Sequence, residues 1–162
     1  MIIEIWTKEK YADNEEKALV ERLSRAGLPV KSAKLSRLYN VDAPWPQQEF
    51  ARLGADLLAD RLTEKYSLSK RPGTGGLYRV EVWLKRSATD VIGESVKEAI
   101  HDMTGRAPAG VRFGRAYYIE GAGRGTRDAV RKLKEVVSKT LANEIVQTIN
   151  IAGPGVRGAG AV

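Results

Sequence analysis

The chain has 162 residues, of which 43% are hydrophobic and 29% charged, with one histidine and no cysteine. This length allows one ordinary domain or two small ones. The missing cysteines exclude disulfides and thiolate chemistry, and a single histidine leaves a structural zinc site without its usual ligands. We therefore expect a cytoplasmic protein that binds no metal and no cofactor.

The net charge is +7, from 27 basic and 20 acidic side chains, and the excess is spread along the chain. Residues 1–77 hold 13 basic and 11 acidic side chains, and residues 78–162 hold 14 and 9. Proteins that bind nucleic acid usually concentrate Lys and Arg more strongly. We interpret the excess as a solvated basic surface and expect no nucleic-acid partner. No apolar run approaches the ~20 residues of a membrane helix, so no membrane partner is expected.

The first half of the chain predicts a strand, a helix, a strand and a second helix. In the opening strand apolar side chains alternate with polar ones, the two-residue period of a strand with one buried face. The first helix carries a narrow apolar stripe and is expected to stop at Gly27, before Pro29. The expected bounds are Ile2–Trp6, Glu15–Arg25, Ala33–Val41 and Gln47–Tyr66.

The second half repeats this order and adds a final strand. Gly105 is expected to end its first helix, and Thr126 to cap the start of its second helix. The expected bounds are Tyr78–Lys85, Ile92–Thr104, Val111–Glu120, Asp128–Leu141 and Glu144–Ile151.

The two halves share residue types at a fixed spacing. IEIWTK (3–8) and VEVWLK (80–85) lie 77 positions apart, and LSRLYNVDA (35–43) aligns with FGRAYYIEG (113–121) at an offset of 78. Such agreement in order, spacing and residue type predicts a tandem duplication. Three pairs of residues that correspond in this alignment are Trp6 and Trp83, Arg37 and Arg115, and Tyr39 and Tyr117.

The duplication predicts an α+β fold of two repeated β-α-β-α(-β) modules. A module of about 75 residues buries a modest share of its surface alone, whereas a tethered pair avoids much of the cost of association. We therefore expect a pseudo-symmetric two-layer body with an antiparallel sheet and helices on one side. The expected boundaries are module 1 at 1–68, a flexible linker at 69–76, module 2 at 77–151 and a Gly-rich tail at 152–162.

One stretch suggests a phosphate site. YYIEGAGRGTRDAV (117–130) is expected to run from a strand through a Gly-rich turn into a helix, and a helix N-terminus can hold an anion. The stretch lacks the Gly-Lys-Ser/Thr of a P-loop and the third glycine spacing of the dinucleotide fingerprint. We favour a plain turn capped by Thr126, and leave anion binding by GAGRGT open.

No catalytic set can be assembled from the sequence. His101 lies beside Asp102 on a predicted helix, and no serine is placed with a base and an orienting acid. RFGRAYYI (112–119) loosely resembles the aromatic strand of an RNA-recognition motif, but its glycine follows the first aromatic residue and the Phe-Val step is missing. We predict no catalytic, cofactor-binding or metal-binding residues. The alternative function is a tandem RNA- or anion-binding module with no enzyme partner.

The two equivalent tryptophans are the main candidates for an interface. By strand alternation Trp6 and Trp83 share a face with Glu4 and Glu81, opposite the Ile/Val face. A tryptophan on that face indicates a partly covered surface, which either packs inside the duplicated body or anchors another protein. The full set of candidate partner-interface residues is Trp6, Trp83, Arg37, Arg115, Tyr39 and Tyr117.

Four motifs follow one another in the second half: YRVEVWLK (78–85), D-x-x-G-x-x-V-x-x-A-I-H-x-M-T from Asp90, VRFGRAYYIE (111–120) and LANEIVQTINI (141–151). Through them residues 78–151 resemble the PurS-type small subunit of phosphoribosylformylglycinamidine synthase. The first half is similar in outline only, through IEIWTK and LSRLYNVDA, and keeps neither the glycine nor the LAN ending.

The resemblance implies a role in a ligase complex of de novo purine biosynthesis. In such complexes a large synthetase subunit holds ATP and formylglycinamide ribonucleotide, and a separate glutaminase subunit releases ammonia. The PurS-type subunit is implied to be non-catalytic and to bridge these two partners for ammonia transfer. The resemblance also implies that the two modules pair through their sheets, and it leaves self-association of the whole chain open.

Overall fold

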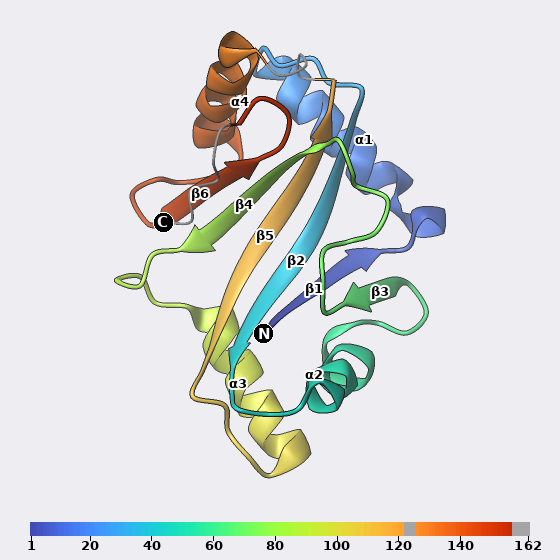
Figure 1. Ribbon diagram of the computed structural model, residues 1–162, viewed down its shortest axis with the longest axis vertical. Helices are drawn as coiled ribbons and strands as arrows, with labels where there is room; N and C mark the ends of the chain where they lie inside the picture. The colour runs from blue at the N-terminus through green and yellow to red at the C-terminus, as the bar shows by residue number, and fades with distance from the viewer. Residues whose placement is uncertain (122–125, 157–162) are drawn as a thin grey trace.

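The computed structural model describes residues 1–121 and 126–156, which form one antiparallel sheet with helices on one face (Figure 1). The strand order is β3-β1-β2-β5-β4-β6. The strands are β1 (Ile2–Thr7), β2 (Ser32–Asp42), β3 (Glu64–Ser67), β4 (Tyr78–Leu84), β5 (Gly110–Glu120) and β6 (Gln147–Ala152). The α-helices are α1 (Glu9–Arg25), α2 (Gln47–Leu53), α3 (Val91–Thr104) and α4 (Arg127–Thr140), and a π-helical turn, Gly54–Leu58, follows α2.

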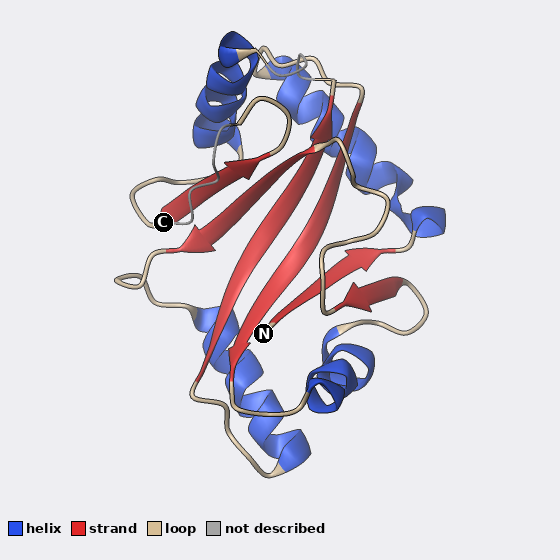
Figure 2. Ribbon diagram, viewed as in Figure 1, coloured by secondary structure: helices blue, strands red, loops and turns tan. Residues whose placement is uncertain are grey.

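The two central strands join the halves of the chain. β2 and β5 pair antiparallel over their whole length, from Ser32 opposite Glu120 to Asp42 opposite Gly110. Each is 11 residues long, about twice the usual length of a strand. Arg37 pairs with Arg115 at the middle of this ladder. Figure 2 shows the two long strands crossing the centre of the sheet, with the shorter strands on either side.

Two apolar cores lie between the sheet and the helices, and each takes residues from both halves of the chain. In the first core, α1 and α4 pack together on β2, β4 and β5. In the second, α2 and α3 pack on β1, β2 and β5. Leu23 of α1 therefore shares a core with Val80 of β4, and Ile100 of α3 shares one with Ile5 of β1. Neither half has a core of its own.

Most expected elements are confirmed, and α1 is longer than expected. The helix start expected at Glu15 is wrong, because α1 begins at Glu9. Residues 9–14 are mostly polar, so the apolar period is weak there, although Ala12 is buried. The predicted stops are confirmed: Gly27 has a φ of 92°, and Gly105 caps α3 in the left-handed conformation with a φ of 74°.

The helix expected over Gln47–Tyr66 is also wrong. It ends in the π-helical turn at Leu58, and the chain then turns back as the edge strand β3. The apolar residues 57, 58 and 62 continue the helical period, so the sequence pattern does not show that the helix ends at Leu58. Tyr66 packs so closely on Gly54 that a Cβ there would lie 2.5 Å from its ring. Asp60 closes the turn by accepting from the backbone N–H groups of Leu62 and Thr63.

Two Gly-rich segments remain, the turn before α4 and the C-terminal tail. Thr126 caps α4 as predicted, since its side chain accepts from the Ala129 N–H. Residues 122–125 of GAGRGT and residues 157–162 of the Gly-rich tail lie outside the described residues. The possible anion site and most of the tail are therefore not described.

Gly114 offers a test of how tightly the face opposite the helices is packed. A Cβ on Gly114 would lie 2.5 Å from the ring of Trp83, its neighbour on β4. We expect Gly114→Ala to lower the free energy of unfolding by about 1–3 kcal/mol, because the ring must shift. Urea denaturation followed by tryptophan fluorescence measures this.

The matched control is Gly110→Ala at the start of the same strand, where a Cβ would meet nothing within 4 Å. We expect this variant to match the wild-type stability or to exceed it slightly. Equal stability of the two variants would show that Trp83 does not pack on Gly114 in solution.

Candidate functional site

The sheet face opposite the helices, here called the helix-free face, carries both predicted tryptophans. It faces the viewer in Figure 1, where the helices lie behind the sheet. Trp6 and Trp83 are each 9% exposed on it, so both are largely covered. Leu38, Ala116 and Tyr118 form a small apolar cluster with Trp83 at its centre. This burial favours packing of each tryptophan ring inside the protein over its use as an anchor for another protein.

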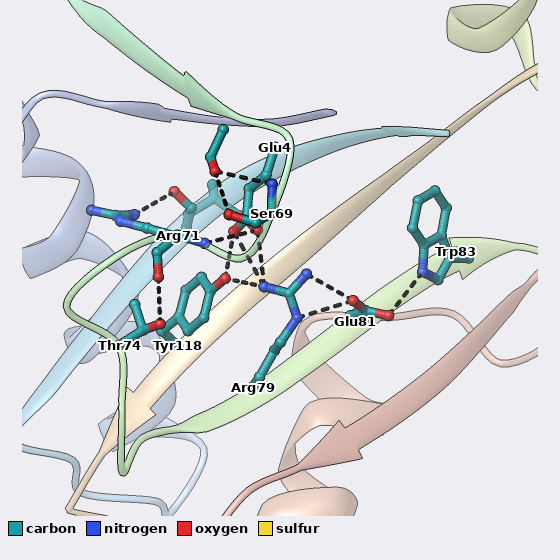
Figure 3. Close-up of polar contacts among 10 residues, drawn as sticks. Glu4, Ser69, Arg71, Thr74, Arg79, Glu81, Trp83 and Tyr118 are labelled. Atoms are coloured by element: carbon teal, nitrogen blue, oxygen red, sulfur yellow. Dashed lines mark hydrogen bonds and ion pairs between the residues drawn. The ribbon is translucent and has the colours of Figure 1, made fainter. Parts of the chain in front are cut away.

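A buried ionic cluster crosses the middle of this face (Figure 3). Glu4 of β1 is 1% exposed and Arg79 of β4 is 9% exposed. Arg79 Nη1 donates to both carboxylate oxygens of Glu4, at 3.1 and 3.3 Å. The hydroxyl of Tyr118, from β5, also donates to Glu4 and lies in close contact with Arg79. Side chains from both halves of the chain thus meet around one carboxylate.

The cluster continues along β4 to the second tryptophan. Arg79 donates from Nε at 3.0 Å and from Nη2 at 2.7 Å to Glu81 Oε1. The other oxygen of Glu81 accepts from Trp83 Nε1 at 3.3 Å. Figure 3 shows Arg79 between the two carboxylates, with Trp83 beyond Glu81. Arg79 is therefore fully engaged in holding two acids.

Burial and charge set the protonation of this cluster. Burial and the hydrogen bond to Glu4 raise the pKa of the Tyr118 hydroxyl well above its usual range. Burial alone would lower the pKa of the Arg79 guanidinium, but the charges of Glu4 and Glu81 outweigh it and leave the pKa raised. Tyr118 therefore stays neutral and Arg79 stays charged at neutral pH.

The segment between the halves closes one side of the helix-free face. Arg71, in the expected linker 69–76, is 6% exposed. Its backbone N–H donates to Glu4 at 3.3 Å, and its guanidinium lies over the Trp6 ring, 5.3 Å from the centroid. Thr74 holds the turn by donating to the Arg71 carbonyl. With Arg71 the cluster contains two guanidiniums and two carboxylates, so their formal charges balance.

The other side of the helix-free face is open. A hollow of about 450 Å³, here called the basic hollow, lies beside Trp83. It is lined by Ile2, Asn40, Trp83, Lys85, Arg86, Arg112, Thr148 and Asn150. Three of these side chains are cations and none is a carboxylate. Arg112 lies over the Trp83 ring, 5.9 Å from its centroid, and donates to the Leu84 carbonyl.

The other four predicted interface residues lie on the helix-bearing face. Tyr39 and Tyr117 are each 6% exposed, within the second and first cores respectively, and burial raises the pKa of both hydroxyls. Arg37 is bound to Glu64 at 2.7 Å, while Arg115 is exposed. The six predicted residues are therefore divided between two faces and do not form one patch.

The described residues offer little to catalysis or to base stacking. His101 is exposed on α3, 3.9 Å from Asp102, as expected of a helix-surface residue. No group of three His, Cys, Asp or Glu side chains in the described ranges could hold a metal, and no helix there is long and apolar enough to cross a membrane. Phe113, Tyr117 and Tyr118, the aromatics of the RNA-motif-like stretch, are 8%, 6% and 1% exposed. They cannot stack on bases as such a motif requires.

Sequence reasoning missed the ionic cluster and the basic hollow. It placed Glu4 outward, on the tryptophan face, but did not conclude that Glu4 itself is covered. The sequence does contain a signal for the burial of Glu4. Trp6 lies on the same face of β1, and a face that covers a tryptophan is expected to cover the adjacent residue on that face as well. Nothing in SKRPGTGG indicated that Arg71 would be buried.

Comparison with known proteins connects the second half of the chain with one family. Residues 77–153 match the family model PurS, described as phosphoribosylformylglycinamidine (FGAM) synthase. The matched part runs from just before β4 to just after β6, slightly less than half of the chain. The match shows that this part of the chain is similar to PurS. No curated protein matches the chain.

The ionic cluster can be tested with Glu4→Gln. This change removes the charge that Arg79 faces inside the protein, and an unpaired buried charge is costly. We expect the free energy of unfolding in urea to fall by about 3 kcal/mol. The control is Glu135→Gln in the exposed Glu135–Lys139 pair, which should leave the stability nearly unchanged because solvent screens the pair. A Glu4→Gln effect no larger than the control effect would mean that Glu4 is solvated.

Proposed function

We propose that this chain is a bridging subunit of FGAM synthase, built from two PurS-like modules, and that it has no catalytic activity of its own. In this proposal it assembles an ATP-dependent synthetase subunit with a glutaminase subunit so that ammonia passes between them. The observation that carries the proposal is the PurS match over residues 77–153. The same proposal places the protein in the cytoplasm.

The strand registers support a PurS-like origin for the first half as well. On β1 and β2, Ile2 pairs with Asn40. Ile2 corresponds to Arg79 at an offset of 77, and Asn40 corresponds to Tyr118 at an offset of 78. Arg79 and Tyr118 are likewise paired, on β4 and β5. A register slip of one residue would turn every side chain to the other face, so agreement in register is a demanding test of equivalence.

The edge strands extend this equivalence. The first half does not keep the LAN ending, but LAD (58–60) stands at an offset of 83 from LAN (141–143). The Asp60 N–H donates to Glu64 Oε1 at 2.9 Å, and the Asn143 N–H donates to Gln147 Oε1 at 2.8 Å. Each turn then leads into an outer strand, β3 or β6.

We further propose a pseudo-twofold axis between Arg37 and Arg115. These residues correspond in the duplication and lie opposite each other in the β2–β5 ladder, as residues beside such an axis must. The strand order β3-β1-β2-β5-β4-β6 reads the same from both ends once the halves are exchanged. The chain would then supply in one molecule what two separate PurS modules supply by pairing.

The bridging function predicts different behaviour with two nitrogen sources. We expect the synthetase and glutaminase subunits from the same organism to make FGAM from glutamine at least about 10-fold faster when this chain is added, because bridging raises the local ammonia concentration. With ammonium chloride as the nitrogen source, the rate should not depend on the chain. Steady-state assays of product formation measure both rates.

An unrelated protein at equal concentration controls for nonspecific stabilisation of the two enzymes. The proposal fails if this chain leaves the glutamine-dependent rate unchanged. It also fails if the ammonium-dependent rate needs the chain, since that result would assign the chain a part in the chemistry.

A further inference from the structure

The two sides of the helix-free face differ in how their charges are balanced. On the side covered by the linker, Arg79 forms ion pairs with Glu4 and Glu81, while the Arg71 guanidinium lies over the Trp6 ring and donates to the Leu35 carbonyl. On the side of the basic hollow, Lys85, Arg86 and Arg112 form no ion pair with any residue in the described ranges. Three cations that form no ion pair with a described residue therefore lie together at the basic hollow.

The proposed duplication makes this difference sharper. At the offsets of 77 and 78, Arg86 corresponds to Glu9 and Arg112 corresponds to Lys34. In the first half these counterparts form an ion pair, with Lys34 Nζ 3.4 Å from Glu9 Oε1. In the second half both positions are arginine. One equivalent site is thus neutralised within the chain, and the other keeps two cations together despite their repulsion.

Large side chains also fill the site in the first half that is equivalent to the basic hollow. Ile2 and Asn40 of the basic hollow correspond to Arg79 and Tyr118, whose large side chains join the buried cluster. The linker lies over that cluster through Arg71. No described segment lies over the basic hollow in the same way, and its small side chains leave the volume open.

We propose that the basic hollow docks an acidic segment of a partner protein, one segment for each chain. The proposal rests on the bridging function and names the face that one partner subunit would contact. The lining offers three cations for carboxylates, and Asn40, Thr148 and Asn150 for the peptide backbone of the segment. Because the linker lies over the equivalent part of the first half, the proposal expects one such contact for each chain on this face.

The lining fits a peptide better than a nucleic acid. The one aromatic ring, Trp83, is 9% exposed and already lies beneath Arg112, so no ring face is free to stack on a base. All three cations of the basic hollow also border a second hollow, whose lining includes the carboxylates of Asp42, Asp90 and Glu94. None of these carboxylates pairs with the cations, and Asp90 is bound to the N–H groups of Gly93 and Phe113.

The test is the double variant Lys85→Glu/Arg86→Glu, with Lys132→Glu/Lys134→Glu as its matched control. Arg86 is exposed and Lys85 is half-buried at the rim, so the test variant should keep its fold, which circular dichroism checks. The control makes the same change in charge on two exposed lysines of α4, far along the chain from the hollow. The probe is a fluorescein-labelled hexaglutamate peptide, followed by fluorescence anisotropy.

We expect the wild-type protein to bind one peptide per chain, with an affinity that falls as salt is added. The test variant should bind about 10-fold more weakly, and the control variant should lose less than about 2-fold. Equal losses in the two variants would overturn the proposal, because they would show attraction to net charge alone. Tighter binding of a single-stranded RNA hexamer, lost in the test variant, would also overturn it in favour of nucleic acid.

A second measurement separates this proposal from the bridging function. The test and control variants are each mixed with the synthetase and glutaminase subunits, and complex formation is followed by analytical ultracentrifugation. Loss of the complex in the test variant alone supports the docking site. If the test variant assembles as well as the control, the docking site is overturned and the bridging function stands. If the wild-type chain forms no complex, the bridging function fails, and the peptide titration still decides the chemistry of the hollow.

Discussion

The pairing of β2 with β5 is the constraint on which the rest of the structure depends. These strands align 11 residues each, and every other strand adds outward from them. Because the ladder joins the halves, α1 comes to lie with α4 and α3 with α2, so both cores are shared. A protein built in this way cannot separate into two domains without exposing both cores. Joining the halves in one chain removes most of the entropic cost of bringing them together.

The same constraint shapes the face opposite the helices. A sheet covered on one side leaves its other face to be closed by other means, and here the two sides of that face differ. On one side Glu4, Arg79 and Tyr118 form a buried cluster that Arg71 covers. Such a cluster contributes less to stability than its contacts suggest, because its charges had to be desolvated. On the other side Lys85, Arg86 and Arg112 line the basic hollow without an ion pair to any described residue, and the proposed partner would supply their counterions.

Sequence periodicity predicted the elements of the second half well, because each has a strong apolar period and clear stop residues such as Gly105. It was wrong over Gln47–Tyr66, where the helical period runs on into a turn. The end of that helix depends on the contact of Tyr66 with Gly54, which lie in separate elements, and local propensity does not report such contacts. The face of each tryptophan followed from strand alternation alone. The burial of Glu4 and Arg71 did not, since it requires knowing how the linker crosses the sheet.

The proposed duplication rests on similar hexapeptides in β1 and β4 and on matching strand registers in the two halves. The turn at Asp60 and the turn at Asn143 share a backbone-to-side-chain hydrogen bond although their strands share few residues. Hydrogen-bond geometry preserves such a relation after side chains on the surface have changed. The departures between the halves, such as Glu9 against Arg86, then become informative about function.

The native mass of this chain, mixed with the synthetase and glutaminase subunits in the presence of glutamine, tests the central claim most directly. The account predicts one species that contains all three proteins, and no species of comparable mass when this chain is left out. A synthetase–glutaminase complex that forms equally well without the chain, or a chain that joins neither protein, would contradict it.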